Sequence, residues 1–148
     1  MKTFEDLFIK SNGECVEYKG RTIQMFDRLV IADGQKFRLV VESVNSDWRQ
    51  GIHMTVDEYF EVNSQITERS LVLWQDTAPP EIILRVKTKK CECVIKNFWD
   101  VGDGVIHSWH NGGAMIVDKM ENGFRYRCND GKNDDDFDDL VFRLEYIN

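Results

Sequence analysis

Apolar and polar residues alternate along most of this chain in short runs, and turn-forming residues separate one run from the next. Side chains on a strand point to opposite faces with a period of two, so such runs are typical of half-buried β-strands. Many short strands at this spacing favour an all-β fold, an antiparallel β-sandwich or jelly roll. The predicted strands are residues 14–18, 22–26, 28–31, 36–44, 52–62, 70–75, 81–88, 91–99, 106–109, 114–120, 124–129 and 140–147.

Only the N-terminal segment shows a helical period. Phe4, Leu7 and Phe8 recur at helical spacing behind Thr3, whose hydroxyl is a good N-terminal cap. The sequence therefore predicts one short amphipathic helix over residues 3–10. Residues 52–62 are less clear, and a strand fits them slightly better than a helix.

Glycine-containing turns connect several of the runs. Residues 19–21 and 121–123 each lie between two strand-like runs and predict β-hairpins, and Asp33-Gly34 predicts a turn between residues 28–31 and 36–44. Pro79-Pro80 breaks the pattern, and we interpret it as a loop inside one domain. Residues 1–148 are thus expected to form a single β-sandwich domain, with an acidic loop at residues 129–139 before the last strand.

The net charge and the hydropathy of the chain argue against two classes of partner, nucleic acids and membranes. The net charge of −7 and the pI near 5.0 argue against nucleic acid, which requires a basic face. No stretch approaches the roughly 18 apolar residues of a membrane span, and acidic residues interrupt the N-terminus where a secretory peptide is apolar. We expect a soluble, cytoplasmic protein with no membrane partner, and release by an unconventional route stays open.

The four cysteines are Cys15, Cys91, Cys93 and Cys128. Without an export signal they are expected to be buried or half-buried thiols rather than disulfides. Cys91 and Cys93 are two residues apart in a predicted strand, which would place both on one face. A zinc site that combines them with His107 and His110 is an alternative, but the ligand spacing fits no common pattern.

The densest chemistry in the chain is the acidic loop. Residues 130–139 contain six aspartates and one lysine, and so carry five of the seven net negative charges. Two like charges about 4 Å apart repel by roughly 1–4 kcal/mol at surface-like dielectrics. Clustered carboxylates are also the oxygen ligands that calcium prefers, at 6–8 per ion. The loop therefore predicts a calcium site formed by Asp130, Asp134, Asp136, Asp138 and Asp139.

Local geometry supports convergence of these acids. Along an extended backbone Asp134, Asp136 and Asp138 point to one side, Gly131 permits a tight turn, and Phe137 is expected to be a hydrophobic peg under the loop. An EF-hand is rejected, because Asp139 stands where that loop requires glycine and no exit helix can follow Glu145.

The spacing acid-x-x-x-Asp-x-Asp-aromatic-Asp-Asp resembles the calcium loop of the small bacterial fucose- and mannose-binding lectins. On that resemblance Asp130 is the upstream acid, Asp134 and Asp136 are the alternating aspartates, Phe137 is the aromatic residue, and Asp138 and Asp139 are the closing pair. The resemblance covers about ten residues. It implies a jelly-roll sandwich, two adjacent calcium ions, and sugar hydroxyls that complete their coordination.

Two other interpretations of the loop compete with calcium. The aspartates could form a solvated turn in which their oxygens accept bonds from backbone N–H groups. Alternatively, the chain is an intracellular structural or interaction protein, and the loop contacts a basic partner without metal.

A second, weaker candidate is the segment around His107, Trp109 and His110, together with Trp99. The apolar faces of the tryptophans suit stacking on a sugar ring, but the favoured interpretation is that both belong to the core. A hydrolase that uses either histidine ranks lowest, because no nucleophile or catalytic motif accompanies them.

The sequence thus predicts a calcium-binding, lectin-like β-sandwich module that is not an enzyme. Its expected partners are a carbohydrate or a protein ligand. The oligomeric state is open, and a homodimer is included among the alternatives.

Overall fold

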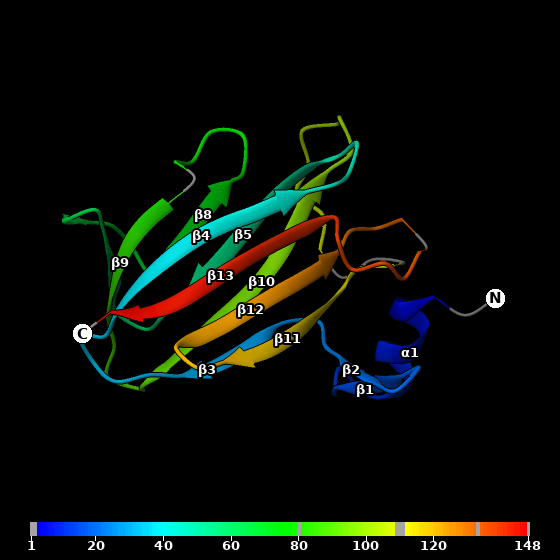
Figure 1. Ribbon diagram of the computed structural model, residues 1–148, viewed down its shortest axis with the longest axis horizontal. Coiled ribbons are helices and arrows are strands. Elements are labelled where there is room, and N and C mark those ends of the chain that lie inside the picture. The colour runs from blue at the N-terminus through cyan, green and yellow to red at the C-terminus, as the bar shows by residue number, and fades with distance from the viewer. Residues whose placement is uncertain (1–2, 80, 109–111, 133, 148) are drawn as a thin grey trace.

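The computed structural model describes residues 3–79, 81–108, 112–132 and 134–147 (Figure 1). Two antiparallel β-sheets face each other in this part of the chain, and one short helix lies beside them at the N-terminus. The prediction of an all-β antiparallel sandwich with a single N-terminal helix is therefore confirmed.

The helix α1 spans Phe4–Lys10. Thr3 caps it: the Thr3 hydroxyl accepts a hydrogen bond from Asp6 N, and the Asp6 carboxylate accepts one from Thr3 N, a reciprocal capping box. Phe4 and Phe8 are buried on one face of the helix, as their spacing predicts. The short hairpin of β1 (Val16–Tyr18) and β2 (Arg21–Ile23) follows, as predicted.

The larger sheet has the order β11-β12-β13-β4-β9-β6-β7. All its neighbouring strands are antiparallel. Its strands are β4 (Lys36–Val44), β6 (Tyr59–Val62), β7 (Gln65–Ile66), β9 (Glu81–Lys87), β11 (Ala114–Met120), β12 (Gly123–Asn129) and β13 (Leu140–Ile147).

The smaller sheet has the order β3-β10-β5-β8 and is also antiparallel. Its strands are β3 (Asp27–Val30), β5 (Arg49–Thr55), β8 (Ser70–Trp74) and β10 (Glu92–Asp100).

Alternating apolar residues from both sheets meet in one core. In β9, for example, Ile82, Leu84 and Val86 are buried while the residues between them are not. Tyr126 stacks on Phe142 with ring centroids 4.7 Å apart. Burial of this apolar surface is the main force that holds the sheets together.

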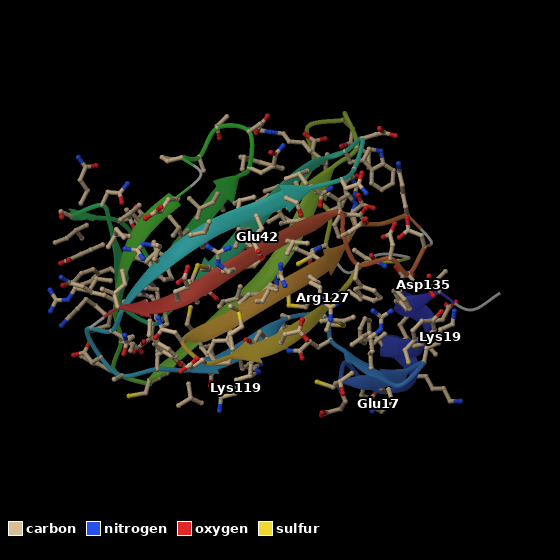
Figure 2. All side chains as sticks on the ribbon, viewed as in Figure 1. Glu17, Lys19, Glu42, Lys119, Arg127 and Asp135 are labelled. Atoms are coloured by element: carbon tan, nitrogen blue, oxygen red, sulfur yellow. The ribbon has the colours of Figure 1, made fainter. Side chains whose placement is uncertain are left out.

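The outer face of the larger sheet carries opposite charges in pairs. Arg125 and Arg143 both contact Glu42, at 2.7 and 3.2 Å, and Arg127 contacts Asp118 at 2.9 Å. Glu42 and Arg127 are labelled on this face in Figure 2. The acids on this face are therefore paired with arginines, and most of the net negative charge of the chain lies instead in the acidic loop.

The pairing of the strands differs from what chain order suggests. The turn at 32–35 forms, but β3 and β4 on either side of it lie in opposite sheets. Residues 52–62 form two strands, β5 and β6, which also belong to different sheets. Turn residues fix where the chain reverses, whereas the partner of each strand depends on which apolar faces meet.

Smaller differences concern two segments. The two-residue strand β7 is absent from the prediction because its exposed residues carry no apolar alternation. In the predicted strand 106–109, His107 forms an isolated bridge with Trp99, and residue 109 lies outside the described residues. No helix in the described ranges is both long and apolar enough to cross a membrane.

A glycine in the β11–β12 hairpin tests this packing. Gly123 has φ of +145°, and a Cβ built on it would lie 2.1 Å from the Leu144 carbonyl oxygen. We expect Gly123→Ala to lower the free energy of unfolding by about 3 kcal/mol or more. Gly104→Ala is the control, since Gly104 also has positive φ but open space around it, and should lose about 1 kcal/mol. Equal losses in urea denaturation would contradict the packing argument.

Candidate functional site

The acidic loop joins β12 to β13 at one end of the sandwich (Figure 1). Cys128 of β12 pairs with Leu140 of β13, so the two ends of the loop are held side by side. Asp130 N donates a hydrogen bond to Asp139 Oδ2 at 2.9 Å, which closes the base of the loop. The sheet therefore forces the carboxylates of both arms into a small volume.

Asn129, the last residue of β12, holds the loop from inside. Its Oδ1 accepts a hydrogen bond from Phe137 N at 2.7 Å, and its Nδ2 donates to the Asp134 carbonyl oxygen at 2.8 Å. The Asn129 carbonyl oxygen accepts from Asn97 Nδ2 of β10 at 2.9 Å. Both asparagines are buried. The two bonds within the loop define the path of its backbone, and the bond from Asn97 ties it to the smaller sheet.

Three of the five predicted ligands converge. One oxygen each of Asp134, Asp136 and Asp139 lies within 4.8 Å of the others. Two oxygens bound to one calcium ion lie at most about 5 Å apart, since each is roughly 2.3–2.6 Å from the ion. Asp134 and Asp136 are exposed and Asp139 is buried. The cluster thus has a closed floor and a side open to solvent.

Asp130 lies at the base of the loop and is fully buried. Its Oδ2 accepts hydrogen bonds from Ser46 Oγ and from Gln50 Nε2, the latter at 3.0 Å, and its Oδ1 accepts one from Lys132 N at 3.0 Å. These neutral donors stabilise a buried carboxylate without neutralising it. Besides burial, the proximity of Asp130 raises the pKa of Asp134 and of Asp139.

Asp138 has one satisfied and one unsatisfied oxygen. Asn45 Nδ2 donates to Asp138 Oδ2 at 2.8 Å. Asp138 Oδ1 is buried, and no hydrogen-bond donor of the described residues reaches it. The Asp138 carboxylate is close enough to Asp136 to raise the pKa of that group. A buried carboxylate oxygen without a protein donor is a position that a cation, a proton or an ordered water would satisfy.

Burial and repulsion shift the acids of the cluster in the same direction. Partial burial first, then the contact with Asp138 and the charge of Asp134, raise the pKa of Asp136 to about 6. Burial first, then the charges of Asp130, Asp134 and Asp136, raise the pKa of Asp139 to about 7. The pKa of Asp134 is also raised, mainly because its carboxylate is partly shielded from solvent by the cluster although the residue as a whole is exposed. The ionised cluster is therefore electrostatically strained near neutral pH.

The lysine of the loop does not relieve this strain by direct contact. Lys132 Nζ is 3.2 Å from Asp47 Oδ2 and lies over the Trp48 ring, 5.4 Å from its centroid. Its positive charge lowers the pKa of Asp134, but by less than loss of solvent contact raises it. The ammonium thus lies at the rim of the loop beside the β4–β5 connection.

Phe137 is the buried peg that the sequence predicts, with 1% of its surface exposed. Its φ of +53° is uncommon for a bulky residue, and the hydrogen bond from its N–H to Asn129 holds this conformation.

The aromatic candidates lie apart from the carboxylate cluster or beneath it. Trp99 is buried, and a Cβ on Gly131 would lie 3.1 Å from its ring, so Trp99 forms part of the core beneath the loop. This agrees with the core interpretation. The imidazole of His107 lies 3.2 Å from Asp103. Trp109 and His110 lie outside the described residues.

The predicted burial of the cysteines is correct for only two of them. Cys93 and Cys128 are buried, but Cys15 and Cys91 are exposed. Cys91 has φ of +58° and precedes β10, so it does not share a strand face with Cys93. Burial raises the pKa of the Cys93 thiol to about 12, which disfavours the thiolate that zinc requires.

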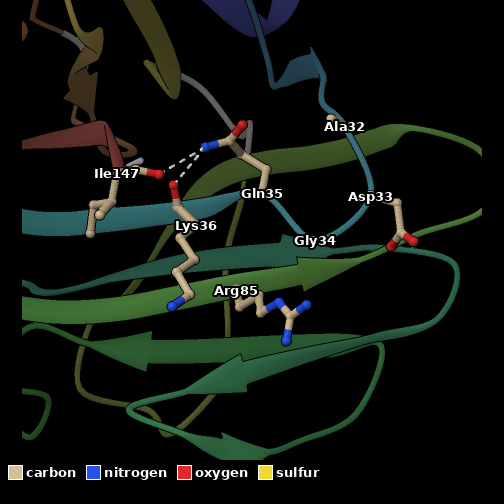
Figure 3. A pocket seen from close by; sticks show the side chains of 7 residues that line it. All are labelled: Ala32, Asp33, Gly34, Gln35, Lys36, Arg85 and Ile147. Atoms are coloured by element: carbon tan, nitrogen blue, oxygen red, sulfur yellow. Dashed lines mark hydrogen bonds between the residues drawn. The ribbon is translucent and has the colours of Figure 1, made fainter.

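A pocket also lies near the other end of the sandwich, at the turn between β3 and β4 (Figure 3). Gln35 crosses it and donates hydrogen bonds to the carbonyl oxygens of Lys36 and Ile147. Arg85 and Asp33 line it. The pocket is open and contains no cluster of like ligands, so the acidic loop is the stronger candidate site.

Sequence reasoning did not identify several residues of the site: Asn45, Ser46, Gln50, Asn97 and Asn129. Asn129 begins the loop itself, whereas the other four come from the β4–β5 connection, β5 and β10, and none of the five carries a motif. Comparison of the chain with protein-family models, curated proteins and solved structures gives no match. The functional argument therefore depends on the geometry of the loop.

The raised pKa values of Asp136 and Asp139 predict a pH dependence of stability. Between about pH 4 and pH 7 the folded state retains protons that the unfolded state has lost, so the free energy of unfolding should fall as the pH rises. Urea denaturation in chelator at pH 5 and pH 8 measures this.

Two variants separate the loop from other groups. Asp136→Asn should reduce the fall in stability. Asp33→Asn, outside the loop, should keep it, because the hydrogen bond from Thr88 N first, and then the charge of Lys87, lower the pKa of Asp33. Burial lowers the pKa of His53, which gives a slope of opposite sign that is common to both variants. Equal pH slopes in the two variants would contradict the assignment to the cluster.

The scaffold role of Asn129 predicts a large loss on truncation. Asn129→Ala leaves Phe137 N and the Asp134 carbonyl oxygen without their partner, so the free energy of unfolding should fall by about 2–4 kcal/mol. Asn122→Ala removes one exposed hydrogen bond to the Tyr146 carbonyl oxygen and should lose less than about 1 kcal/mol. Chemical denaturation in chelator measures the free energy of unfolding of both variants. Similar losses of stability in the two would show that Asn129 does not support the loop.

Proposed function

We propose that this protein is a calcium-binding β-sandwich module whose metal site is the acidic loop. Asp134, Asp136 and Asp139 would hold the ion, and Asp138 and Asp130 would add negative charge and further oxygen ligands. The observation that carries the proposal is the buried Asp138 Oδ1, which has no donor among the described residues and belongs to a carboxylate beside Asp136.

The chemistry of the donor set fits a hard cation. Every candidate ligand is oxygen, which calcium and magnesium prefer, whereas zinc prefers nitrogen and sulfur. Gln50, whose amide nitrogen donates to Asp130, also has a buried amide oxygen without a hydrogen-bond donor in the described ranges. Calcium accepts amide oxygens beside carboxylates and tolerates irregular geometry. The donor set therefore favours calcium over the smaller magnesium ion.

Binding would neutralise the cluster and stabilise the loop against β13. A doubly positive ion among the carboxylates replaces their mutual repulsion with attraction. Asp134 and Asp136 are exposed, so the solvent side of the ion would keep open coordination. Hydroxyl or carboxylate oxygens of a ligand could bind there, and a carbohydrate is the ligand class that the lectin resemblance implies.

A second candidate function is contact with a basic protein partner in the absence of metal. Asp47, beside the loop, has 93% of its side chain exposed, and Asp134 and Asp136 are exposed as well. These charges would attract a basic surface and increase its association rate. Charge reversal at Asp134 and Asp136 that abolishes a specific partner in metal-free buffer would favour this function.

Calcium should raise the melting temperature of the metal-stripped protein. At a free concentration 100 times the dissociation constant, binding to the folded state alone contributes about 2.7 kcal/mol. For a chain of this length that corresponds to roughly 5–10 °C. Isothermal titration calorimetry and differential scanning calorimetry measure the affinity and the shift.

The double variant Asp134→Asn/Asp136→Asn should lose both the heat of binding and the thermal shift. Asp118→Asn, an acid on the outer face of the larger sheet that pairs with Arg127, should retain both. Absence of binding heat and of a thermal shift in the unaltered protein would refute the calcium site. Glycan binding that disappears with chelator would distinguish a lectin from a metal-stabilised scaffold.

A further inference from the structure

Residues 134–137 contact two different parts of the molecule. Asp134 and Asp136 point toward the carboxylate cluster with Asp139. Asp135 and Phe137, the alternate residues, contact the N-terminal unit, which we define as residues 3–23 with α1, β1 and β2. A movement of the backbone at residues 134–137 would therefore change both the carboxylate cluster and the contacts with the N-terminal unit.

The apolar contact is made by Phe137. Its ring centroid lies 5.5 Å from that of Phe4 in α1, and Phe4 makes an edge contact with Tyr18 at 4.9 Å. The cluster that contains these rings includes Ile23 of the unit and Ala114 of β11. It is separate from the core between the two sheets. Phe137 thus supplies a substantial part of the surface on which the unit docks.

The polar contact is made by Asp135. Lys19 Nζ lies 2.9 Å from Asp135 Oδ2, and the Tyr18 hydroxyl donates to the same oxygen at 3.3 Å. The guanidinium of Arg21 donates to the Asp135 carbonyl oxygen at 3.4 Å and lies over the Phe137 ring. Figure 2 shows Asp135 and Lys19 together at this junction.

We propose that docking of the N-terminal unit and neutralisation of the acidic loop are coupled, so that each strengthens the other through Asp135 and Phe137. With calcium as the neutralising ion, this inference deepens the proposed function and rests on it: the unit would increase the calcium affinity of the loop.

The coupling arises because docking of the unit and neutralisation of the loop order the same backbone segment. Repulsion among ionised carboxylates favours expansion of the loop, which would move Asp135 and Phe137 away from the unit. Docking fixes the same backbone in the conformation that gathers Asp134 and Asp136, so part of the entropy loss on ion binding has already occurred. Coupling of this kind is reciprocal for binding free energies.

The test on the metal-bound side uses an uncharged change. Phe4→Ala removes the ring that contacts Phe137 without altering the charge near the loop. We expect the dissociation constant for calcium to rise about fivefold to tenfold, within the usual range of such coupling. Phe4→Leu retains most of the apolar volume and should change the constant less than about twofold. Removal of Lys19 is unsuitable, since loss of a cation near the loop would itself favour calcium.

The test on the metal-free side uses hydrogen exchange of the whole protein in chelator. Asp134→Asn/Asp136→Asn removes two charges of the cluster without metal. We expect slower exchange of the amides of α1 and of the β1–β2 hairpin than in the unaltered protein, by about threefold or more. Asp118→Asn lies on the outer face of the larger sheet and should leave these rates unchanged.

The outcomes separate the two proposals. If calcium binds the unaltered protein and Phe4→Ala with equal affinity, and exchange in the unit is unchanged in the double variant, the coupling is refuted and the calcium site stands. If calcium does not bind but the double variant slows exchange in the unit, the calcium site is refuted and the coupling to loop charge stands. If calcium does not bind and exchange is unchanged, both proposals fail.

Discussion

The antiparallel pairing of β12 with β13 is the constraint on which the site depends. It holds Cys128 opposite Leu140 and so fixes the ends of the eleven-residue loop 129–139, which carries six aspartates. Without this constraint the carboxylates would move apart into solvent, because the repulsion energy of each close pair is comparable to the net free energy of a hydrogen bond. Burial of the flanking strands in the core supplies the free energy that keeps them together.

Neutral hydrogen-bond donors define the path of the loop between those fixed ends. Asn129 holds Phe137 and Asp134 from inside, and Ser46 and Gln50 hold Asp130 from the β4–β5 side. Such donors stabilise the ionised form of a buried carboxylate without removing its charge. The loop is consequently well defined in shape, with the exposed carboxylates of Asp134 and Asp136 at its open side.

The sequence predicts local features of this fold well and long-range ones less well. Alternation in residues 81–88 and 140–147 correctly predicts strands, and Thr3 correctly marks the start of the helix. The sheet to which each strand belongs was not predictable, since Asp33-Gly34 signals a turn equally well within a sheet and between sheets. Cys91 was misplaced because the chain adopts a positive φ there, a conformation that the type of residue does not reveal.

The same distinction applies to the site. The period of two in an extended backbone predicts that Asp134, Asp136 and Asp138 converge, whereas the structure groups Asp134 and Asp136 with Asp139, another predicted ligand, because the positive φ of Phe137 interrupts the period. The supporting residues Asn97 and Gln50 lie in β10 and β5, more than 30 positions before the loop residues that they contact. No local pattern links them to the loop, and only the packing of the sheets brings them to it.

The alternation that gathers the acids on one side of residues 134–137 also determines what the other side does. While Asp134 and Asp136 lie in the cluster, Asp135 and Phe137 contact α1 and the β1–β2 hairpin, and the positive φ of Phe137 is part of the backbone path that allows this. The N-terminal unit shares little with the main core, so its stability depends on a segment whose conformation is itself opposed by charge repulsion. Whatever neutralises the cluster therefore acts on the unit as well, because the backbone between them is the same four residues.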